Sequence, residues 1–285
     1  MIWPETYAQA LTLTAPLECR GVGLHSGSQA RVRLEPSDRP GYRVGGLAEP
    51  GSELIPLHPS QVCETQLCTA LRFDQRRLAT VEHLLAAIVG TGLSHLDILV
   101  DGEEVPLLDG SALAWVEAIG EAGLTTLGER EPLLELSAPI TLQQGQSFAT
   151  ALPSTRPWIG AAIEFSQPAI GRQFYSLELT PRSFVSEIAP ARTFGFREQV
   201  EQLQKAGLIK GGDLSNALVC DGQQWLNPPL RFAQEPVRHK LLDLLGDLAL
   251  VGLPRAQVFA FRGSHGLHTA LAAALAAQSD LPEAR

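Results

Sequence analysis

Two periods of apolar and polar residues alternate along the first half of the chain. Strand-like alternation is found at 30–34 and 96–100, and helical spacing at 80–89 and 112–119. A polar stretch at 125–131 then carries Gly128 and alternating charges. We predict a boundary between two domains at this stretch, with an N-terminal domain at 1–127 and a C-terminal domain at 128–285.

The second half shows the same order of elements. Strand-like runs are found at 133–142, 159–165 and 173–179, and helical runs follow at 197–206, 235–250 and 267–277. Because strands are grouped ahead of helices, the pattern favours an α+β layered architecture over a doubly wound parallel sheet. No strict sequence repeat accompanies this similarity, so a duplication would be visible only in the structure.

The composition is that of a globular chain with a sizeable core. Of the 285 residues, 45% are hydrophobic and 19% are charged, without a long biased tract. The formal net charge of −9, without a basic cluster, argues against nucleic acid and anionic lipid surfaces as partners. The four cysteines show no Cys-x-x-Cys spacing, so we expect reduced thiols.

The sequence shows neither a secretory signal nor a membrane span. Its N-terminus lacks a basic start followed by an apolar stretch. The longest apolar runs, such as 267–277, fall short of the roughly 20 residues that a transmembrane helix needs. We therefore expect a cytoplasmic protein without a transmembrane segment.

A polar stripe runs along the helix predicted at 235–250. His239, Asp243 and Asp247 are spaced by four residues and share one face of this otherwise apolar helix. An imidazole and two carboxylates in line are suited to metal or acid–base chemistry. Taken alone, the stripe also fits an ordinary solvated face with a His–Asp pair.

Two further fragments carry groups of the same kind. Glu82 and His83 are adjacent in an apolar helical run, so their side chains point about 100° apart. One of them can therefore bind a metal while the other faces a water on that metal. Ser264 and His265 stand in a glycine-flanked loop between a strand-like and a helical run. The alternative interpretation of Glu82 and His83 is a surface carboxylate beside a capped histidine.

Together the three fragments supply the parts of a catalytic zinc site. Two imidazoles and one carboxylate can bind zinc and leave a fourth position open to water. These ligands would be His83, His239 and Asp243. Glu82 suits the general base that takes a proton from the attacking water. His265, kept protonated by a carboxylate such as Asp247, could stabilise the oxyanion or protonate the leaving amine.

A series of short motifs is distributed along nearly the whole chain. The motifs stand at 21–27 (GVGLHSG), 80–84 (TVEHL), 106–111 (PLLDGS), 191–196 (ARTFGF), 211–212 (GG), 237–240 (VRHK, followed by Asp243), 246–247 (GD) and 264–265 (SH). In these motifs the chain resembles the UDP-3-O-acyl-N-acetylglucosamine deacetylases, zinc enzymes of lipid A biosynthesis. The order and approximate spacing of the motifs agree with this family over nearly the whole chain, so the resemblance is specific.

The resemblance implies the same ligands, base and acid as the three fragments, and it adds further roles. Thr193 matches a threonine that hydrogen-bonds the scissile carbonyl or the oxyanion, and Asp247 a carboxylate that orients the catalytic histidine. Lys240 matches a lysine near the nucleotide or diphosphate. The aromatic matches are Phe194 and Phe196 near the sugar and Phe165 stacked on uracil. His25, in the first motif, is a possible further site residue.

The fold that the resemblance implies consists of two similar layered α/β sandwich domains with the active site between them, each with a small insert. The second insert, at about 208–226, would form an apolar passage for the fatty acyl chain. Its expected wall residues include Leu214 and Ala217, together with Ile209, Leu218 and Val219. A plain surface loop is the competing explanation of this segment.

The chain departs from the family pattern at three places. The loop before the catalytic histidine has Gly263 and Ser264 where the family usually has Ser-Gly, and His268 stands where an asparagine is common. Asp213 replaces the serine that usually follows the two glycines of the insert. Transposing glycine and serine changes the freedom of the loop backbone.

The function implied is removal of the N-acetyl group of UDP-3-O-[(R)-3-hydroxyacyl]-N-acetylglucosamine, the committed step of lipid A biosynthesis, by a monomer with one zinc ion per chain. Its partner would be this UDP-sugar lipid precursor. One alternative is a zinc amidohydrolase of the same fold that acts on a different N-acyl sugar. The other is a non-catalytic nucleotide-sugar binding protein. A substrate panel that varies nucleotide and acyl chain separates the enzymes, since lost remote contacts lower turnover.

Overall fold

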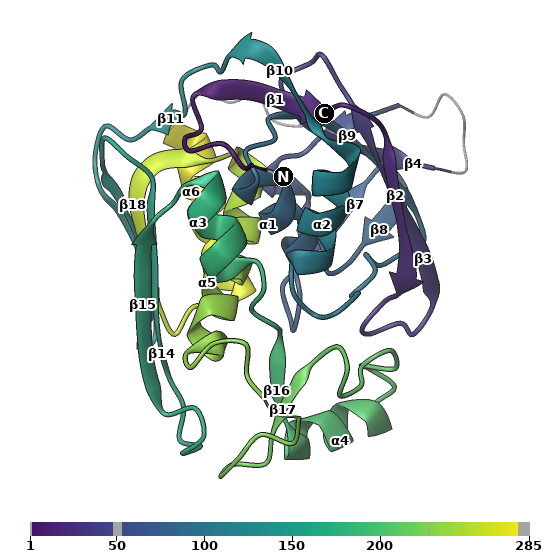
Figure 1. Cartoon of the computed structure of the whole chain (residues 1–285). Coiled ribbons are helices and arrows are strands. Elements are labelled where there is room, and N and C mark those ends of the chain that lie inside the picture. The colour runs from purple at the N-terminus through teal and green to yellow at the C-terminus, as the bar shows by residue number, and fades with distance from the viewer. Residues whose placement is uncertain (1, 48–52, 228, 279–285) are drawn as a thin grey trace.

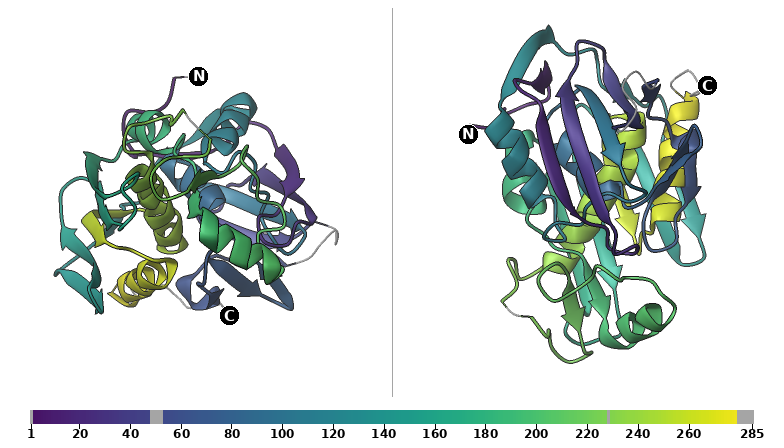
Figure 2. Two further views of the ribbon diagram at one scale, coloured as in Figure 1. Left: turned by 90° about the horizontal axis from the view of Figure 1, so that it is seen from below. Right: turned by 90° about the vertical axis from the view of Figure 1, so that its right-hand side faces the viewer.

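Two large sheets face each other across a layer of helices, and a small subdomain extends below them (Figure 1). The computed structural model describes residues 2–47, 53–227 and 229–278. In the right-hand view of Figure 2 the same subdomain, drawn in green, again forms the lower end of the molecule.

The first half of the chain forms one of these sheets. Its strands in spatial order are β2 (Leu17–Val22), β3 (Gln29–Pro36), β9 (His95–Asp101), β4 (Gly41–Gly46) and β5 (Ile55–Pro56). Strand β9 is antiparallel to β3 and parallel to β4. Along β3 the side chains of Ala30, Val32 and Leu34 are buried while Arg31 and Arg33 between them are partly exposed, so the alternation that predicted this strand is confirmed.

The second half repeats this topology. The corresponding strands are β12 (Ile140–Gln144), β13 (Ser147–Pro153), β18 (Pro254–Phe261), β14 (Trp158–Glu164) and β15 (Arg172–Glu178), with β11 (Leu134–Glu135) beside β18. Strand β18 is antiparallel to β13 and parallel to β14, as β9 is to β3 and β4. The predicted α+β fold of two similar layered halves is confirmed.

The helices of the two halves correspond as well. In each half one helix precedes the central strand of the sheet, β9 or β18, and another follows it. These helices are α1 (Glu82–Gly90) and α2 (Leu113–Ala122) in the first half, and α5 (Glu235–Leu248) and α6 (His265–Gln278) in the second. All nine residues of α1 are buried. A Cβ at Gly246 of α5 would overlap the backbone of Glu82, so α1 and α5 pack backbone to backbone.

The small subdomain lies between β15 and α5 in the sequence. It contains β16 (Phe194–Phe196), α4 (Arg197–Lys205) and β17 (Leu218–Cys220), and its two strands are parallel. The predicted passage segment at 208–226 covers the second part of this unit, while β16 and α4 precede it.

The remaining elements are short or lie at the edges. They are β1 (Gln9–Leu13), η1 (Pro59–Gln61), β6 (Val62–Glu64), β7 (Ala70–Phe73), β8 (Arg76–Leu78), β10 (Leu124–Glu129), α3 (Pro181–Ser183), η2 (Phe184–Ile188) and η3 (Ala249–Val251). Within the part of the chain that the structure describes, no helix is long and apolar enough to cross a membrane.

Two element predictions differ from the structure. The polar stretch at 125–131 is largely strand β10, which pairs with β1 although most of its side chains are exposed. Backbone hydrogen bonds to β1 form this strand, and its side-chain pattern therefore carries little signal. The single strand predicted at 133–142 is divided into β11 and β12. The boundary between residues 127 and 128 stays a prediction, and it falls inside β10.

Candidate metal and acid–base centre

The side chains of the three sequence fragments meet where the N-terminal end of α1 crosses α5. They line a cavity of about 270 Å³ together with residues of the loops that precede β16 and α6. Among its lining residues are Glu82, His83, Thr193, Phe194, His239, Lys240, Asp243 and His265. Residues more than 180 positions apart in the sequence thus share one cavity.

Three ligand atoms of His83, His239 and Asp243 lie within 4.8 Å of one another, and all three residues are buried. The Nε2 atom of His239 is 3.2 Å from Asp243 Oδ1, and that of His83 is 3.7 Å from the same oxygen. The other ring nitrogen of His239, Nδ1, is 3.0 Å from the carbonyl oxygen of Ala191. This contact assigns the proton to Nδ1 and leaves Nε2 as a lone-pair donor.

The charges of this cluster suit a cation. Burial lowers the pKa of His83 to about 3 and also lowers the pKa of His239, so both imidazoles are neutral near pH 7. Burial opposes the charge of Asp243, but Lys240 and the nearby histidines hold its pKa well below the usual value. The Lys240 ammonium lies 2.8 Å from Asp243 Oδ2, which leaves Oδ1 facing the two imidazoles.

The geometry fits a tetrahedral zinc ion. Ligands at the usual zinc distances of about 2.0–2.1 Å would be separated from one another by about 3.3 Å. The two His–Asp separations of 3.2 and 3.7 Å bracket that value before any adjustment. Two neutral imidazoles and one carboxylate are also a donor set that zinc prefers.

Glu82 is held beside this cluster as a buried carboxyl group. Its Oε2 accepts a hydrogen bond from the backbone N–H of Thr69, at 3.0 Å, and its side chain is almost completely buried. Burial raises the pKa of Glu82 to about 7, against the opposing charge of His265. Thr80, two residues before Glu82, has a left-handed φ of 58° and donates a hydrogen bond to Glu104. A strained backbone therefore immediately precedes the functional helix.

His265 is the first residue of α6 and faces both Glu82 and Asp247. Its Nδ1 lies 3.0 Å from Asp247 Oδ2, and its Nε2 lies 3.8 Å from Glu82 Oε1. Burial works against a charge on His265, but Asp247 and Glu82 together raise its pKa to about 9. Thr69 Oγ1 donates a hydrogen bond to the other oxygen of Asp247, at 2.5 Å. The histidine is therefore a cation near pH 7, with Nε2–H directed toward Glu82.

The predicted aromatic residues form a cluster next to the cavity. The ring centroid of Phe165 is 5.7 Å from that of Phe194 and 5.4 Å from that of Phe196. Phe194 also packs edge-on to His239, at 6.4 Å, and Lys240 Nζ lies 5.9 Å from its ring centroid. Only Phe194 of the three aromatics lines the cavity of the metal cluster.

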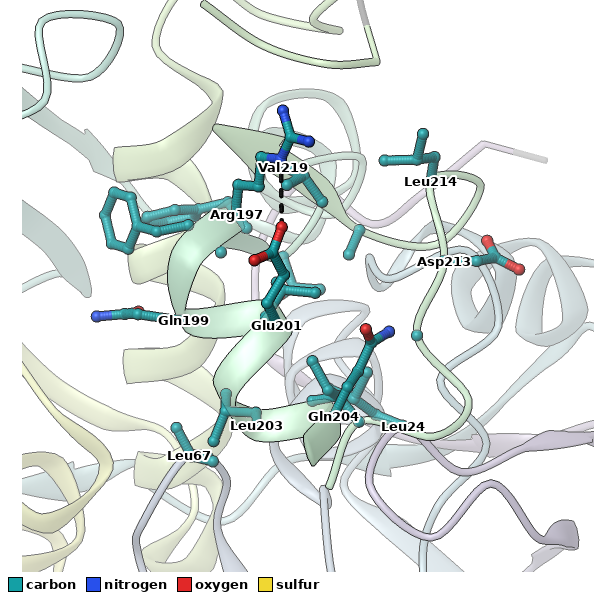
Figure 3. Close-up of a pocket in the computed structure, with 18 of the residues that line it drawn as sticks. Leu24, Leu67, Arg197, Gln199, Glu201, Leu203, Gln204, Asp213, Leu214 and Val219 are labelled. Atoms are coloured by element: carbon teal, nitrogen blue, oxygen red, sulfur yellow. Dashed lines mark ion pairs between the residues drawn. The ribbon is translucent and has the colours of Figure 1, made fainter. Parts of the chain in front are cut away.

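A second, largely apolar cavity of about 370 Å³ adjoins the first, and Leu24, Leu67, Thr193 and Phe194 line both. Leu214 and Ala217 line it, as do Ile209 and Val219, whereas Leu218 is fully buried and is not among the lining residues. Figure 3 shows Leu203 and Gln204 of α4 on one side and Leu214 on the other, with an Arg197–Glu201 ion pair along the helix. The wall from α4 was not predicted from the sequence.

A sequence profile of the family described as LpxC, UDP-3-O-acyl N-acetylglycosamine deacetylase, matches residues 10–277. The chain belongs to this family. The family consists of metal-dependent enzymes, and the cluster of His83, His239 and Asp243 is a group that could bind the metal.

Three relatives illustrate how far the similarity extends. The UDP-3-O-acyl-N-acetylglucosamine deacetylase of Trichormus variabilis is 47% identical over 276 residues, which cover 94% of this chain and 99% of that protein. The deacetylase of the same name from Thermosynechococcus vestitus is 46% identical over 269 residues, 94% of each chain. A probable mitochondrial UDP-3-O-acyl-N-acetylglucosamine deacetylase 1 of Arabidopsis thaliana is 40% identical over 283 residues, covering 92% and 86%.

Several residues that shape the site were not found from the sequence. Thr69 bonds both Glu82 and Asp247, yet a lone threonine between two strands gives no signal. Buried Glu235 accepts hydrogen bonds from the backbone and the guanidinium of Arg192, and so ties the segment before Thr193 to the start of α5. The sequence shows an acidic residue, Glu235, at the start of a predicted helix, but it does not show that Arg192 is its partner.

His25, a possible site residue from the first motif, lies at the edge of the apolar cavity. Its backbone N–H donates to Glu104 Oε1 at 2.9 Å, and both ring nitrogens are buried without a protein partner in the described structure. Burial lowers its pKa, with Glu104 opposing. A neutral imidazole whose two ring nitrogens have no protein partner therefore stands in the wall of the apolar cavity.

Proposed function

We propose that this chain removes the N-acetyl group of UDP-3-O-[(R)-3-hydroxyacyl]-N-acetylglucosamine, giving acetate and a free amine in lipid A biosynthesis. The observation that carries the proposal is the cluster of His83, His239 and Asp243 beside Glu82 and His265, next to an apolar cavity. Membership of the deacetylase family and the names of the relatives support the substrate.

In this proposal His83, His239 and Asp243 hold one zinc ion per chain. When bound, zinc supplies Lewis acidity, which makes water a nucleophile near neutral pH and polarises a carbonyl group. Lys240 neutralises the second oxygen of Asp243 and, lining the cavity beside Phe194, would also offer a cation to the diphosphate.

Glu82 acts as the general base. Its Oε2 is occupied by the Thr69 N–H, so Oε1 is the oxygen that accepts the proton from the attacking water. A pKa of about 7 places this carboxyl group where it can both take and release a proton at neutral pH.

His265 acts as the cationic partner on the other side of the reacting carbonyl. Because Nδ1–H donates a hydrogen bond to Asp247, the ring stays protonated and its Nε2–H faces the reacting carbonyl. This N–H would donate a hydrogen bond to the developing oxyanion and then transfer its proton to the leaving amine. The backbone N–H of Thr193 donates to Gly110 and its carbonyl accepts from Leu218. Thr193 lines the cavity, and in this proposal its hydroxyl would donate a hydrogen bond to the same oxygen.

The remaining predicted site residues would contact the substrate away from the reacting amide. Phe194 and Phe196 would border the sugar, and Phe165 would stack on uracil. Leu214 and Ala217 would contact the acyl chain in the apolar cavity. His25, whose ring nitrogens have no protein partner, would bind a polar group of the substrate in the apolar cavity.

We also propose a monomer in the cytoplasm. All the groups named above come from one chain, so catalysis needs no second copy, and sedimentation analysis tests this. The four cysteines form no disulfide, in keeping with a reducing compartment, and cell fractionation tests that location.

The decisive experiment measures acetate release from the acylated UDP-sugar by zinc-loaded protein, with metal analysis. Glu82→Gln keeps size and removes the base, and should lower kcat by about 10²- to 10⁴-fold while one zinc per chain is retained. Glu117→Gln, an exposed carboxylate on α2, is the matched control and should change nothing. Absence of acetate release by the wild type, or full activity of Glu82→Gln, would refute the proposal.

A further inference from the structure

A further histidine, His268, contacts the carboxylate that orients His265. His268 stands one helical turn after His265 on α6, and its Nδ1 lies 3.0 Å from Asp247 Oδ2, the oxygen that also faces His265 Nδ1. The side chain is 1% exposed. Burial lowers the pKa of His268 although Asp247 opposes this, so the ring is neutral and its single proton is on Nδ1.

The Asp247 carboxylate is therefore bonded from three sides. Thr69 donates to Oδ1, while His265 and His268 both donate to Oδ2. The carboxylate is completely buried, and a buried charge keeps its orientation only while its hydrogen-bond donors are in place. Without His268, only one donor on each oxygen would hold the carboxylate, and one of these is the histidine that it has to orient.

Gly263 provides the space that the ring of His268 occupies. A Cβ at residue 263 would overlap His268 Nε2 and come within 3.1 Å of the Cβ of Ala260. The φ of Gly263 lies outside the left-handed region, so backbone conformation does not require glycine there. The side chain of His268 does require it, because a ring held by Asp247 cannot move aside without losing its hydrogen bond.

Ser264 completes the arrangement at the start of the helix. It immediately precedes α6, and its Oγ accepts a hydrogen bond from the backbone N–H of Leu267 at 3.3 Å. Serine is a favoured residue at this capping position, and glycine only a tolerated one. The Gly-Ser order thus places the small residue against His268 and the capping residue directly before His265.

We infer that His268 is a positioning residue that holds Asp247 for His265, and that Gly263 and His268 form a coupled pair. This loop departs from the family pattern in the transposed Gly-Ser and in the histidine that replaces asparagine. Both departures are then explained together, because the ring of His268 needs the space that Gly263 provides. This inference rests on the proposed function for the role of His265, whereas the coupling of Gly263 and His268 rests on packing alone.

A double-mutant cycle with two readouts tests the inference on the zinc-loaded full chain. His268→Leu keeps bulk without a donor and should lower kcat about tenfold, the scale of one hydrogen bond to a charge, with little change in KM. His268→Asn keeps an N–H donor and should recover most of that loss. Gly263→Ala should lower kcat like His268→Leu, and the double variant Gly263→Ala/His268→Asn should recover, because the shorter asparagine leaves room for the new methyl group.

The second readout is the imidazole Nδ1–H resonance of His265 by NMR, which reports its bond to Asp247 independently of activity. It should broaden or shift in His268→Leu and Gly263→Ala, and persist in His268→Asn and the double variant. An unchanged resonance and kcat in His268→Leu would overturn the positioning role. An equal effect of Gly263→Ala in the two backgrounds would overturn the coupling. Absence of acetate release by the wild type would refute the proposed function instead, and the resonances would still decide this inference.

Discussion

Gly246→Ala is the substitution that most directly tests how the two halves build the site. Gly246 lies on α5, where a Cβ would overlap the backbone carbonyl of Glu82 on α1. These two helices carry all three candidate metal ligands, His83 on α1 and His239 and Asp243 on α5. Since the obstructing atoms belong to the backbone, the added methyl group can be accommodated only if the helices separate.

The magnitude follows from two opposing effects. Overpacking of a close contact costs about 3 kcal/mol at the upper end of the usual range. Replacing glycine by alanine inside a helix stabilises the folded state by about 1 kcal/mol. The net loss should therefore be about 2 kcal/mol, or a fall in Tm of about 3 °C, because the entropy of unfolding is roughly 2.1 cal/mol/K per residue and grows with chain length. Separation of the helices should also weaken zinc binding by about 10- to 100-fold, the effect of disturbing the support of a metal ligand.

Gly120→Ala is the matched control, because Gly120 also lies inside a helix, α2, but its nearest neighbour is Trp3 at an ordinary 3.6 Å from the added Cβ. This variant should gain about 0.5–1 kcal/mol and leave zinc affinity unchanged. Thermal unfolding and zinc competition with a chromophoric chelator measure both quantities. If Gly246→Ala behaved like Gly120→Ala in both assays, the backbone contact would not be what brings the ligands together.

Three further predictions concern the acid–base pair and the apolar cavity. The value of kcat/KM should rise as Glu82 loses its proton near a pKa of about 7 and fall as His265 loses its proton near a pKa of about 9, and a pH profile with one limb would contradict this pairing. Asp247→Asn should shift the alkaline limb to lower pH, because the charge that raises the pKa of His265 is gone; an unmoved limb would assign that limb to another group. Ala217→Trp should fill the apolar cavity and raise KM for long-chain substrates about tenfold or more while sparing short-chain analogues, and equal effects on both would place the acyl chain elsewhere.

The sequence determined much of the fold and most of the candidate residues, because local periodicity and residue spacing predict both. The two-residue period of β3 and the four-residue spacing of His239, Asp243 and Asp247 follow from the geometry of a strand and a helix. Strand β10 escaped prediction because hydrogen bonds to the distant β1, rather than buried side chains, define it. The wall formed by α4 escaped for a similar reason, since a polar helix does not reveal which cavity it borders.

Only the tertiary structure decided how the fragments combine. The stripe on α5 could have been a solvated face, and packing of α1 against α5 at Gly246 is what buries it beside His83. Burial then sets the chemistry, because removal from water raises the pKa of Glu82 while Asp247 keeps His265 charged. The partners of Asp247, Thr69 and His268, are 178 and 21 residues away from it, and contacts at such separations depend on the packing of whole elements rather than on any local spacing.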